Sequence, residues 1–210
     1  MLEKLDFKKE YKDLYMPKGK PVFIQVPAIQ FIMVDGRGDP DDEEYQNAVG
    51  LLYALSFTIK MSKMGGNQPD GYFDYVVPPL EGLWNCEMKG FDPDHRETWS
   101  WTSMIRQPDF VTQNVFAWAC EQAAKKKPEL DFTKARLETY DEGACVQIMH
   151  VGPFRTEPDS VRQIDQFIKE HDYIDDCGGE RWHHEIYLSD PRKCVPERMK
   201  TVLRHPIKAK

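Results

Sequence analysis

The hydrophobic and polar positions of this chain follow one order twice. In the first copy, an apolar run over residues 22–34 leads into a glycine turn, and a proline-marked acidic segment then opens a helical pattern. In the second copy, an apolar run over residues 135–151 leads into another glycine turn and a second helix start. Aligning Gly38 with Gly152 superposes the two turns. The pattern predicts two related halves with a ligand groove between them.

Three segments carry apolar residues at helical spacing. The first follows Asp39 and Pro40, which supply a cap and a helix-compatible proline, and it ends at residues 65–66, a glycine pair. The second covers about residues 113–127, and the third starts at Pro158.

Apolar and alternating runs predict the strands. They cover residues 22–34 (interrupted at Pro27), 72–84 (bent at the prolines 78–79), 99–105, 135–151 (bulged near 141–143), 182–188 and 199–205. Each half is therefore predicted to contain a strand, a helix and two further strands, in that order. The predicted fold class is α+β: tandem pseudo-symmetric β-α-β-β repeats, with an antiparallel sheet, helices on one face and a ligand cleft between the halves.

Length and hydrophobic content set the domain organisation. A chain of 210 residues with 40% hydrophobic content can bury a full core. We expect residues 1–20 to form a polar N-terminal leader that drapes over the surface. Residues 21–210 are expected to form a single domain of two repeats, about 21–110 and 130–208, joined by the helix at 113–127 as a bridge.

Charge and cysteine usage exclude several classes of protein. A net charge of −7 and a pI near 5.4 argue against a nucleic-acid surface. The N-terminus has no apolar signal region and no apolar stretch reaches bilayer length, which predicts a cytoplasmic protein without a membrane partner. The five cysteines are scattered and lack C-x-x-C spacing, so we expect reduced thiols, no metal site and no cofactor.

One acidic residue stands out in the strand at 182–188. Side chains alternate along a strand, so His183, Glu185 and Tyr187 share one face and His184 and Ile186 the other. The second set is the more apolar and suits packing under the helices, which predicts that Glu185 points to the open face. A solvent-facing strand glutamate is the alternative interpretation. The adjacent histidines face apart, so they cannot jointly bind a metal.

Two tryptophans share a face of the strand at 99–105. Trp99, Trp101 and Ser103 alternate with small hydroxyl residues and a methionine on the other face. Two flat indoles can clasp a planar molecule in a ligand pocket. Core or edge-covering aromatics are the alternative interpretation of the same pair.

The chain resembles a known family at several of these positions. The turn His150-Val-Gly-Pro-Phe154 before a helix, the strand His184-Glu-Ile-Tyr-Leu188 and the tandem halves resemble the GyrI-like small-molecule-binding family of the SOUL/GyrI superfamily. Residues 74–84 and 99–110 are similar to a stand-alone subgroup associated with hydrolysis of cyclopropane-bearing, DNA-alkylating natural products.

The resemblance implies a hydrophobic, aromatic-lined cleft with a glutamate at its floor, and that glutamate maps to Glu185. In the hydrolytic subgroup it would act as the general base that polarises a water. The expected partner is a lipophilic aromatic small molecule; the alternatives are a non-catalytic drug-sequestering protein and a gyrase-interacting protein. By strand parity and aromatic type, we expect the substrate to meet Tyr187, His183, Trp99, Trp101, Trp84 and Tyr72. Asp74 joins this set because it is the acidic residue in the first-half strand that corresponds to the strand of Glu185. The proton donor stays open between Tyr187 and Tyr72.

Overall fold

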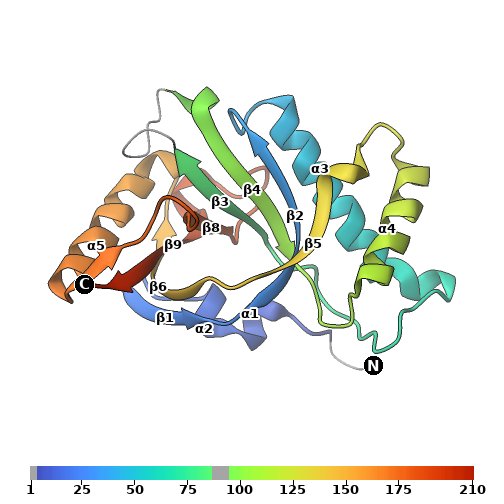
Figure 1. Ribbon diagram of the computed structural model, residues 1–210, viewed down its shortest axis with the longest axis horizontal. Coiled ribbons are helices and arrows are strands. Elements are labelled where there is room, and N and C mark those ends of the chain that lie inside the picture. The colour runs from blue at the N-terminus through green and yellow to red at the C-terminus, as the bar shows by residue number, and fades with distance from the viewer. Residues whose placement is uncertain (1–3, 87–94) are drawn as a thin grey trace. The chain divides into compact units, whose positions relative to one another are not determined.

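The computed structural model describes residues 4–86 and 95–210 (Figure 1). The chain folds into two compact units, each assembled from separate stretches. Unit 1 comprises Met1–Glu10, Ile29–Pro78 and Cys86–Tyr140, and unit 2 comprises Tyr11–Ala28, Pro79–Asn85 and Asp141–Lys210. Each unit combines an antiparallel sheet with helices, which confirms the predicted α+β class. The sequence also predicts a polar hairpin loop over residues 86–97, and most of that segment lies outside the described residues.

Unit 1 is built on a three-stranded sheet whose central strand is β2. Its strands are β2 (Ile29–Arg37), β4 (Trp99–Arg106) and β5 (Ala135–Tyr140). Its helices are α1 (Phe7–Glu10), α3 (Glu43–Lys60), η1 (Met61–Gly65), η2 (Arg96–Thr98), α4 (Gln113–Lys126) and η3 (Phe132–Lys134). Helix α3 packs on β2 and β4, and α4 packs on α3. The helices predicted after Pro40 and over 113–127 are confirmed, and Thr112 caps α4 by accepting a hydrogen bond from the Val115 amide.

Trp101 fills the core of unit 1. It stands opposite Gly36 in the β2–β4 ladder and is 1% exposed. A Cβ on Gly36 would come within 2.2 Å of the indole ring. The edge of the Tyr45 ring packs on Trp101, with ring centroids 5.0 Å apart. Glycine is therefore required at position 36 because the indole lies across its backbone.

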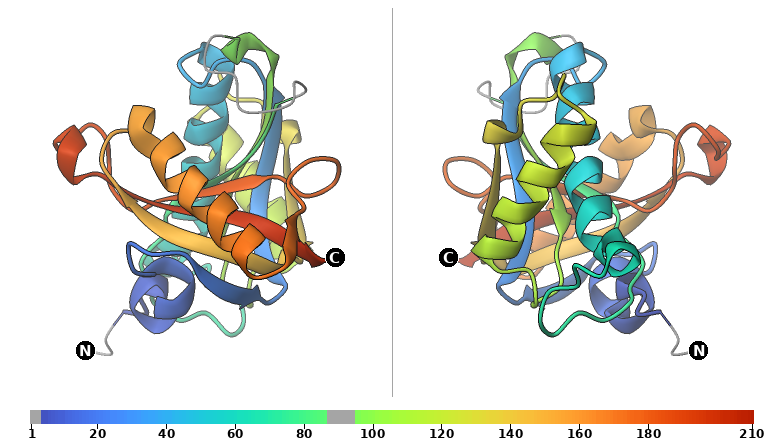
Figure 2. Two further views of the ribbon diagram at one scale, coloured as in Figure 1. Left: turned by 90° about the vertical axis from the view of Figure 1, so that its left-hand side faces the viewer. Right: turned by 90° about the vertical axis from the view of Figure 1, so that its right-hand side faces the viewer.

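Unit 2 carries a sheet in the order β1-β6-β9-β8-β3, and a short strand, β7, also pairs with β9. Its strands are β1 (Val22–Val26), β3 (Leu80–Cys86), β6 (Gly143–Val151), β7 (Tyr173–Asp175), β8 (His183–Tyr187) and β9 (Lys200–Ala209). Its helices are α2 (Lys12–Tyr15), η4 (Phe154–Thr156), α5 (Glu157–Glu170) and η5 (Pro196–Arg198). The predicted helix at Pro158 is thus confirmed. Figure 2 shows α5, in orange, lying along β6 and β9.

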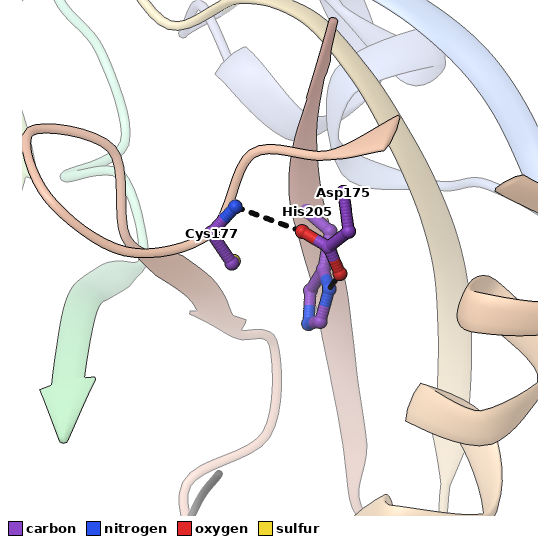
Figure 3. Close-up of side chains that lie close together, drawn as sticks. All are labelled: Asp175, Cys177 and His205. Atoms are coloured by element: carbon purple, nitrogen blue, oxygen red, sulfur yellow. Dashed lines mark hydrogen bonds and ion pairs between the residues drawn. The ribbon is translucent and has the colours of Figure 1, made fainter. Parts of the chain in front are cut away.

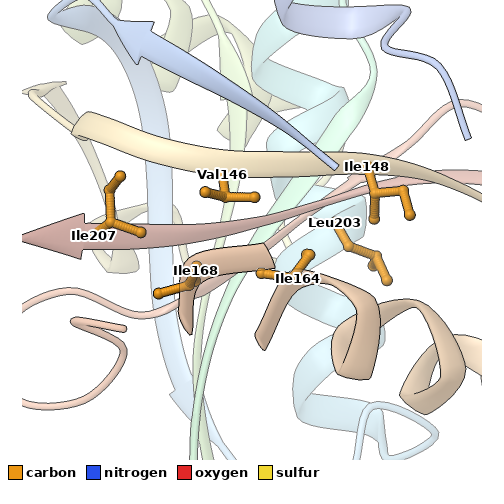
Figure 4. Close-up of a cluster of buried hydrophobic side chains, with 6 residues drawn as sticks. All are labelled: Val146, Ile148, Ile164, Ile168, Leu203 and Ile207. Carbon is orange, nitrogen blue, oxygen red and sulfur yellow. The ribbon is translucent and has the colours of Figure 1, made fainter. Parts of the chain in front are cut away.

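Helix α5 covers one side of this sheet through a compact apolar cluster (Figure 4). Ile164 and Ile168 of the helix meet Val146 and Ile148 of β6 and Leu203 and Ile207 of β9. Each of these six side chains is at most 4% exposed. Burying an aliphatic side chain of this size contributes about 1.5 to 3 kcal/mol, so this cluster fixes the helix on the sheet.

Two runs predicted as single strands each divide between the units. The run at 22–34 breaks at Pro27, after which β1 pairs with β6 of unit 2 and β2 pairs within unit 1. The run at 135–151 breaks before Gly143, whose φ of 69° only glycine adopts readily. The predicted bulges are therefore breaks between strands, because a residue without an amide hydrogen and a residue in the left-handed region both interrupt a ladder.

The predicted strand at 72–84 is shorter in the structure. Only its last part forms β3, while Tyr75 makes one isolated bridge to Leu5. Two consecutive prolines at 78–79 supply no amide hydrogens, so a ladder cannot continue through them. Among the described helices, none is both long enough and apolar enough to cross a membrane.

Candidate functional site

Glu185 lies in the middle of β8. It stands opposite Gly82 of β3 and Leu203 of β9, and it is 6% exposed. Leu203 belongs to the cluster under α5. Because directly paired residues in an antiparallel ladder point to the same side of the sheet, Glu185 lies on the side that α5 covers.

The prediction that Glu185 points to the open face is wrong, although the strand alternation is correct. His183, Glu185 and Tyr187 do share one side, but it is the helix-covered side of unit 2. The other side is covered as well, by the segment that contains α2, whose Tyr15 is 1% exposed. With both sides of β8 covered, the hydropathy of its side chains could not distinguish them. The segment at 1–20, expected to drape over the surface, supplies that second cover.

A second buried carboxyl group lies beside Glu185. Glu157 is the first residue of α5 and is 9% exposed. Its Oε1 atom has no hydrogen-bond partner among the described residues, and the Thr201 hydroxyl donates a hydrogen bond to the carboxyl group. Burial, and then the negative charge of Glu185, raise the pKa of Glu157 to about 9. Glu157 therefore keeps its proton well above the usual range of a glutamate, next to Glu185.

A row of hydrogen bonds leads from Glu185 toward the surface. Glu185 Oε1 lies 3.2 Å from His183 Nε2, and His183 Nδ1 lies 2.8 Å from His205 Nε2. His205 Nδ1 then lies 2.8 Å from Asp175 Oδ2. Burial lowers the pKa of His183, against the opposing hydrogen bond to Glu185. We call these four residues the histidine chain.

A cysteine lies beside the outer end of the histidine chain (Figure 3). Donor atoms of Asp175, Cys177 and His205 lie within 4.8 Å of one another, a spacing that a metal ion could use. Both Asp175 oxygens are already engaged, one by the Cys177 amide at 2.8 Å and one by His205. Burial also raises the pKa of the Cys177 thiol. We interpret the cluster as the hydrogen-bonded end of the chain.

Aromatic side chains lie on the same side of the sheet, beside Glu185. The Trp84 indole donates a hydrogen bond to the Tyr187 hydroxyl at 2.9 Å. The Phe154 ring meets Tyr187 edge-on at 6.0 Å. A Cβ on Gly82, the ladder partner of Glu185, would lie 2.8 Å from the indole nitrogen and 3.1 Å from the phenol oxygen. Glycine at 82 therefore lets the Trp84 and Tyr187 pair approach the backbone next to Glu185.

The opposite side of β8 holds a buried network of hydrogen bonds and ion pairs. His184 meets Glu142 and Glu81 at 3.0 Å each, and Arg204 donates to Glu142 at 2.8 Å. Burial opposes ionisation of Glu142, but His184 and Arg204 outweigh it and lower its pKa to about 2. The carboxylates outweigh the effect of burial on His184 in the same way and raise its pKa to about 9. Glu142 and Arg204 therefore form a buried ion pair, and a protonated His184 lies beside it.

This network also holds the α2 segment on the sheet. Arg204 donates to the Leu14 carbonyl at 2.9 Å, and Gln147 donates to the Asp13 carbonyl at 2.6 Å. The Tyr15 hydroxyl donates to Glu81 at 3.2 Å. We assign the His184 network a structural role, because its polar groups bond to one another and to this segment.

The remaining predicted site residues lie in unit 1. Asp74 pairs with Lys60 and Lys63, and the Tyr72 hydroxyl donates to the Lys60 carbonyl at 2.7 Å. These contacts give Asp74 and Tyr72 structural partners around the end of α3. Their binding roles stay predictions.

The two tryptophans of β4 are both buried in unit 1. Trp99 is 7% exposed, and the Arg96 guanidinium lies 5.5 Å from its ring. Trp101 and Ser103 lie on the same face of β4 as Trp99. Trp101 Nε1 and Ser103 Oγ have no hydrogen-bond partner among the residues that the structure describes. Buried donors nearly always have a hydrogen-bond partner, and a polar ligand atom or a water molecule can be that partner. The ligand-binding role of the indoles stays a prediction.

Sequence reasoning missed Glu157, Thr201, His205 and Asp175. Glu157 precedes Pro158 and has the ordinary signature of an acidic helix start. His205 lies in the middle of β9, two residues from Leu203, and that spacing alone would place it on the Glu185 side. The pairing of β8 with β9, which brings His205 to His183, is long-range information that no local pattern carries.

The comparison with protein-family models identifies the family of the chain. The model described as the GyrI-like small molecule binding domain matches residues 19–208. The chain belongs to the GyrI-like family. Glu185, Glu157 and the histidine chain therefore all lie within the matched GyrI-like domain.

Solved structures from Listeria innocua are similar over nearly the whole GyrI-like chain. An uncharacterized conserved protein is 57% identical, with a TM-score of 0.94, and the match covers 98% of this chain and all of that one. Two structures named as hydrolases are 54% and 55% identical, with TM-scores of 0.90 and 0.91 and the same coverage. A search of the curated proteins finds no match.

Proposed function

We propose that this GyrI-like protein binds hydrophobic aromatic molecules and hydrolyses electrophilic ones among them, with Glu185 as general base. The observation that carries the proposal is the unequal pair of buried carboxyls. Glu185 has a histidine partner, whereas Glu157 has one unpartnered oxygen and a pKa raised to about 9 by burial and by Glu185. Two carboxyl groups in such different surroundings suit one base and one acid.

Opening of an activated cyclopropane uses both groups. When the ring is conjugated to a dienone, a water oxygen bonds to the ring carbon while a ring carbon–carbon bond breaks. Its electron pair moves through the conjugated system to the carbonyl oxygen. Glu185 takes the proton that the water loses, and the carboxylic acid of Glu157 gives a proton to the oxygen that becomes a phenol. Passing the proton from Glu185 to Glu157 restores the pair.

The surroundings of the pair support an aromatic substrate. Trp84, Tyr187 and Phe154 place rings on the Glu185 side of unit 2, and indole and phenol rings favour flat apolar ligands. The Tyr187 hydroxyl oxygen accepts the hydrogen bond of the Trp84 indole. The names of two relatives at 54% and 55% identity support hydrolysis as the reaction class.

The direct test is incubation of the purified protein with a cyclopropane-bearing alkylator of this class, followed by mass spectrometry of the product. We expect a ring-opened product heavier by one water, formed over many turnovers. Glu185→Gln should abolish it, because an amide cannot take up the proton. Glu121→Gln, at an exposed position of α4, is the matched control and should retain full activity. Undiminished product in Glu185→Gln would rule out this role for Glu185.

A non-catalytic binding protein is the second candidate, and the description of the matched family favours it. In that case the protein would protect the alkylator in a stoichiometric amount without forming product. Tryptophan fluorescence titration with the same compound measures the binding. Saturable quenching with no product separates the binding protein from the enzyme.

A further inference from the structure

One pair of opposed residues in the β6 and β9 ladder lies under the start of helix α5. His150 of β6 and Thr201 of β9 are directly paired, so their side chains point to the same side of the sheet. It is the side of Ile148 and Leu203, which lie two residues away in the same strands and pack under α5. His150 is 5% exposed and Thr201 is 1% exposed. Both side chains are therefore buried beneath the helix that carries Glu157.

The His150 imidazole contacts the chain on both sides of Glu157. Its Nδ1 atom lies 2.9 Å from the hydroxyl of Ser160, which follows Glu157 in the first turn of α5. Its Nε2 atom lies 3.2 Å from the hydroxyl of Thr156, the residue before Glu157, and 3.3 Å from the Pro153 carbonyl. The Thr156 hydroxyl also donates to that carbonyl at 2.8 Å. One buried ring therefore holds the turn before Glu157 and the helix after it.

The carboxyl group of Glu157 has few bonds of its own. The Thr201 hydroxyl donates to it, and its Oε1 atom has no hydrogen-bond partner among the described residues. The titratable group that acts on it is Glu185 of β8, whose negative charge opposes its ionisation. Because so few side-chain bonds fix the carboxyl group, its position depends on the backbone turn that carries it.

The same turn also places an aromatic ring of the candidate site. Phe154 follows Pro153, whose carbonyl lies against His150. The Phe154 ring meets the Tyr187 ring edge-on, with centroids 6.0 Å apart. The turn lies close to the imidazole, since a Cβ on Gly152 would come within 3.3 Å of Nε2. Loss of the imidazole contacts should therefore displace the aromatic ring as well as the acid.

We propose that His150 positions the acid of the candidate site: it fixes the first turn of α5 so that the Glu157 carboxyl group lies beside Glu185 and Phe154 lies against Tyr187. His150 acts through these groups and is a positioning residue. The part of Glu157 as an acid in turnover rests on the proposed function, whereas its placement by His150 does not.

The placement is measured by carbon NMR of the Glu157 carboxyl between pH 6 and 10, with the signal assigned by Glu157→Gln. The wild-type signal should titrate near 9, the pKa that burial and Glu185 give Glu157. His150→Phe keeps a buried ring and removes both polar contacts. Water should then reach the loosened turn, and we expect the Glu157 pKa to fall by about one unit or more. An unchanged Glu157 pKa in His150→Phe would overturn the proposal.

Ser160→Ala tests the same contact from the helix and remains informative if His150→Phe fails to fold. It removes only the hydroxyl that lies at Nδ1, so the Glu157 pKa should fall in the same direction and by less. The double variant should shift this pKa no further than His150→Phe alone, because both substitutions remove one shared contact. A shift equal to the sum of the two single shifts would contradict the contact, as would an unmoved pKa in Ser160→Ala.

Ile168→Val is the control for a general loss of stability. It shortens a buried side chain of α5 in the turn farthest from Glu157 and destabilises the packing of the helix. We expect the Glu157 pKa to stay near 9 in this variant. A fall as large as that in His150→Phe would show that any loosening of α5 moves the carboxyl group, which would contradict a specific role of His150.

Turnover supplies an independent readout. With a cyclopropane-bearing probe, we expect His150→Phe to lower kcat about tenfold through misplacement of the acid, and Ile168→Val to keep the wild-type kcat. A wild-type kcat in His150→Phe would contradict its role in turnover. A wild type that gives no product would contradict the proposed function, and the Glu157 titration would still decide the placement. An unmoved titration in His150→Phe with product lost in Glu185→Gln would contradict only this inference.

Discussion

Glu142 and Glu157 are both buried in unit 2, on opposite sides of one sheet, and their surroundings drive their ionisation in opposite directions. Glu142 meets Arg204 and His184 and has a pKa lowered to about 2. Glu157 meets a hydroxyl group and a second carboxyl, and its pKa is raised to about 9. Burial is similar at both positions, so the partners decide the outcome. The compensated side holds the fold together, and the uncompensated side is the candidate for chemistry.

Removing the charge on the compensated side should have the largest effect. Glu142→Gln leaves Arg204 and His184 buried with one fewer counter-charge, and breaking a buried ion pair costs about 3 to 5 kcal/mol. We expect the free energy of unfolding to fall by about that amount at pH 7, measured by urea denaturation. Glu121→Gln serves again as the exposed control. A loss no larger than that of the control would show that the network does not stabilise the fold.

A glutamate-to-glutamine substitution at Glu157, on the opposite side of the sheet, should raise the free energy of unfolding. Glu157→Gln removes a group that is protonated in the folded state and ionised in the unfolded state at pH 7. We expect the free energy of unfolding to rise by about 2 kcal/mol at pH 7. It should not change at pH 4, where Glu157 is protonated in both the folded and the unfolded state. Urea denaturation at the two pH values measures the difference. Equal stability of variant and wild type at pH 7 would mean that burying Glu157 costs nothing.

The raised pKa values also predict the alkaline behaviour of the wild type. Glu157 and His184 each have a folded pKa of about 9, above their ordinary values of 4.5 and 6.5. Each therefore contributes stability that is complete below its ordinary value and is lost as pH rises toward 9. Thermal unfolding between pH 6.5 and 9 should show a falling melting temperature, less steep in Glu157→Gln. A wild-type melting temperature that stays constant between pH 6.5 and 9 would contradict the raised pKa values of both Glu157 and His184.

The smallest change tests how the network holds the N-terminal segment. Tyr15→Phe removes the hydroxyl that donates to Glu81 at 3.2 Å and keeps the buried ring. We expect a loss of about 1 kcal/mol, the usual net value of one hydrogen bond, seen by urea denaturation. Hydrogen exchange of the amides in α2 should quicken at the same time. Unchanged exchange would show that α2 is held by packing alone.

Local pattern predicted the elements better than it predicted their partners. The starts of α3 and α5 follow from capping residues and prolines beside apolar stripes, and β8 follows from alternation. The pairing of β1 with β6 and of β2 with β5 does not, because a run such as 22–34 gives no sign that its two parts join different units. The side of the sheet to which Glu185 points was predicted wrongly for the same reason, because the segments that cover each side of β8 are distant in the sequence.

The candidate site shows the same limit at the level of residues. Glu185, His183 and Tyr187 were predicted from alternation along their strand, and Trp84 from its aromatic type. Glu157 was missed because an acidic residue before a proline is an ordinary helix start, and its burial depends on where α5 docks. The unequal carboxyl pair is thus a property of the tertiary structure.

The central claim is that Glu157 is a carboxylic acid in the resting protein while its counterpart Glu142 is ionised. Carbon NMR of the glutamate side-chain carboxyls, with assignment by Glu157→Gln and Glu142→Gln, measures both directly over pH 4 to 10. The account predicts that the Glu157 signal keeps its protonated position at pH 7 and titrates near 9, while the Glu142 signal is already that of a carboxylate at pH 4. A Glu157 signal that titrates below pH 6 would contradict it.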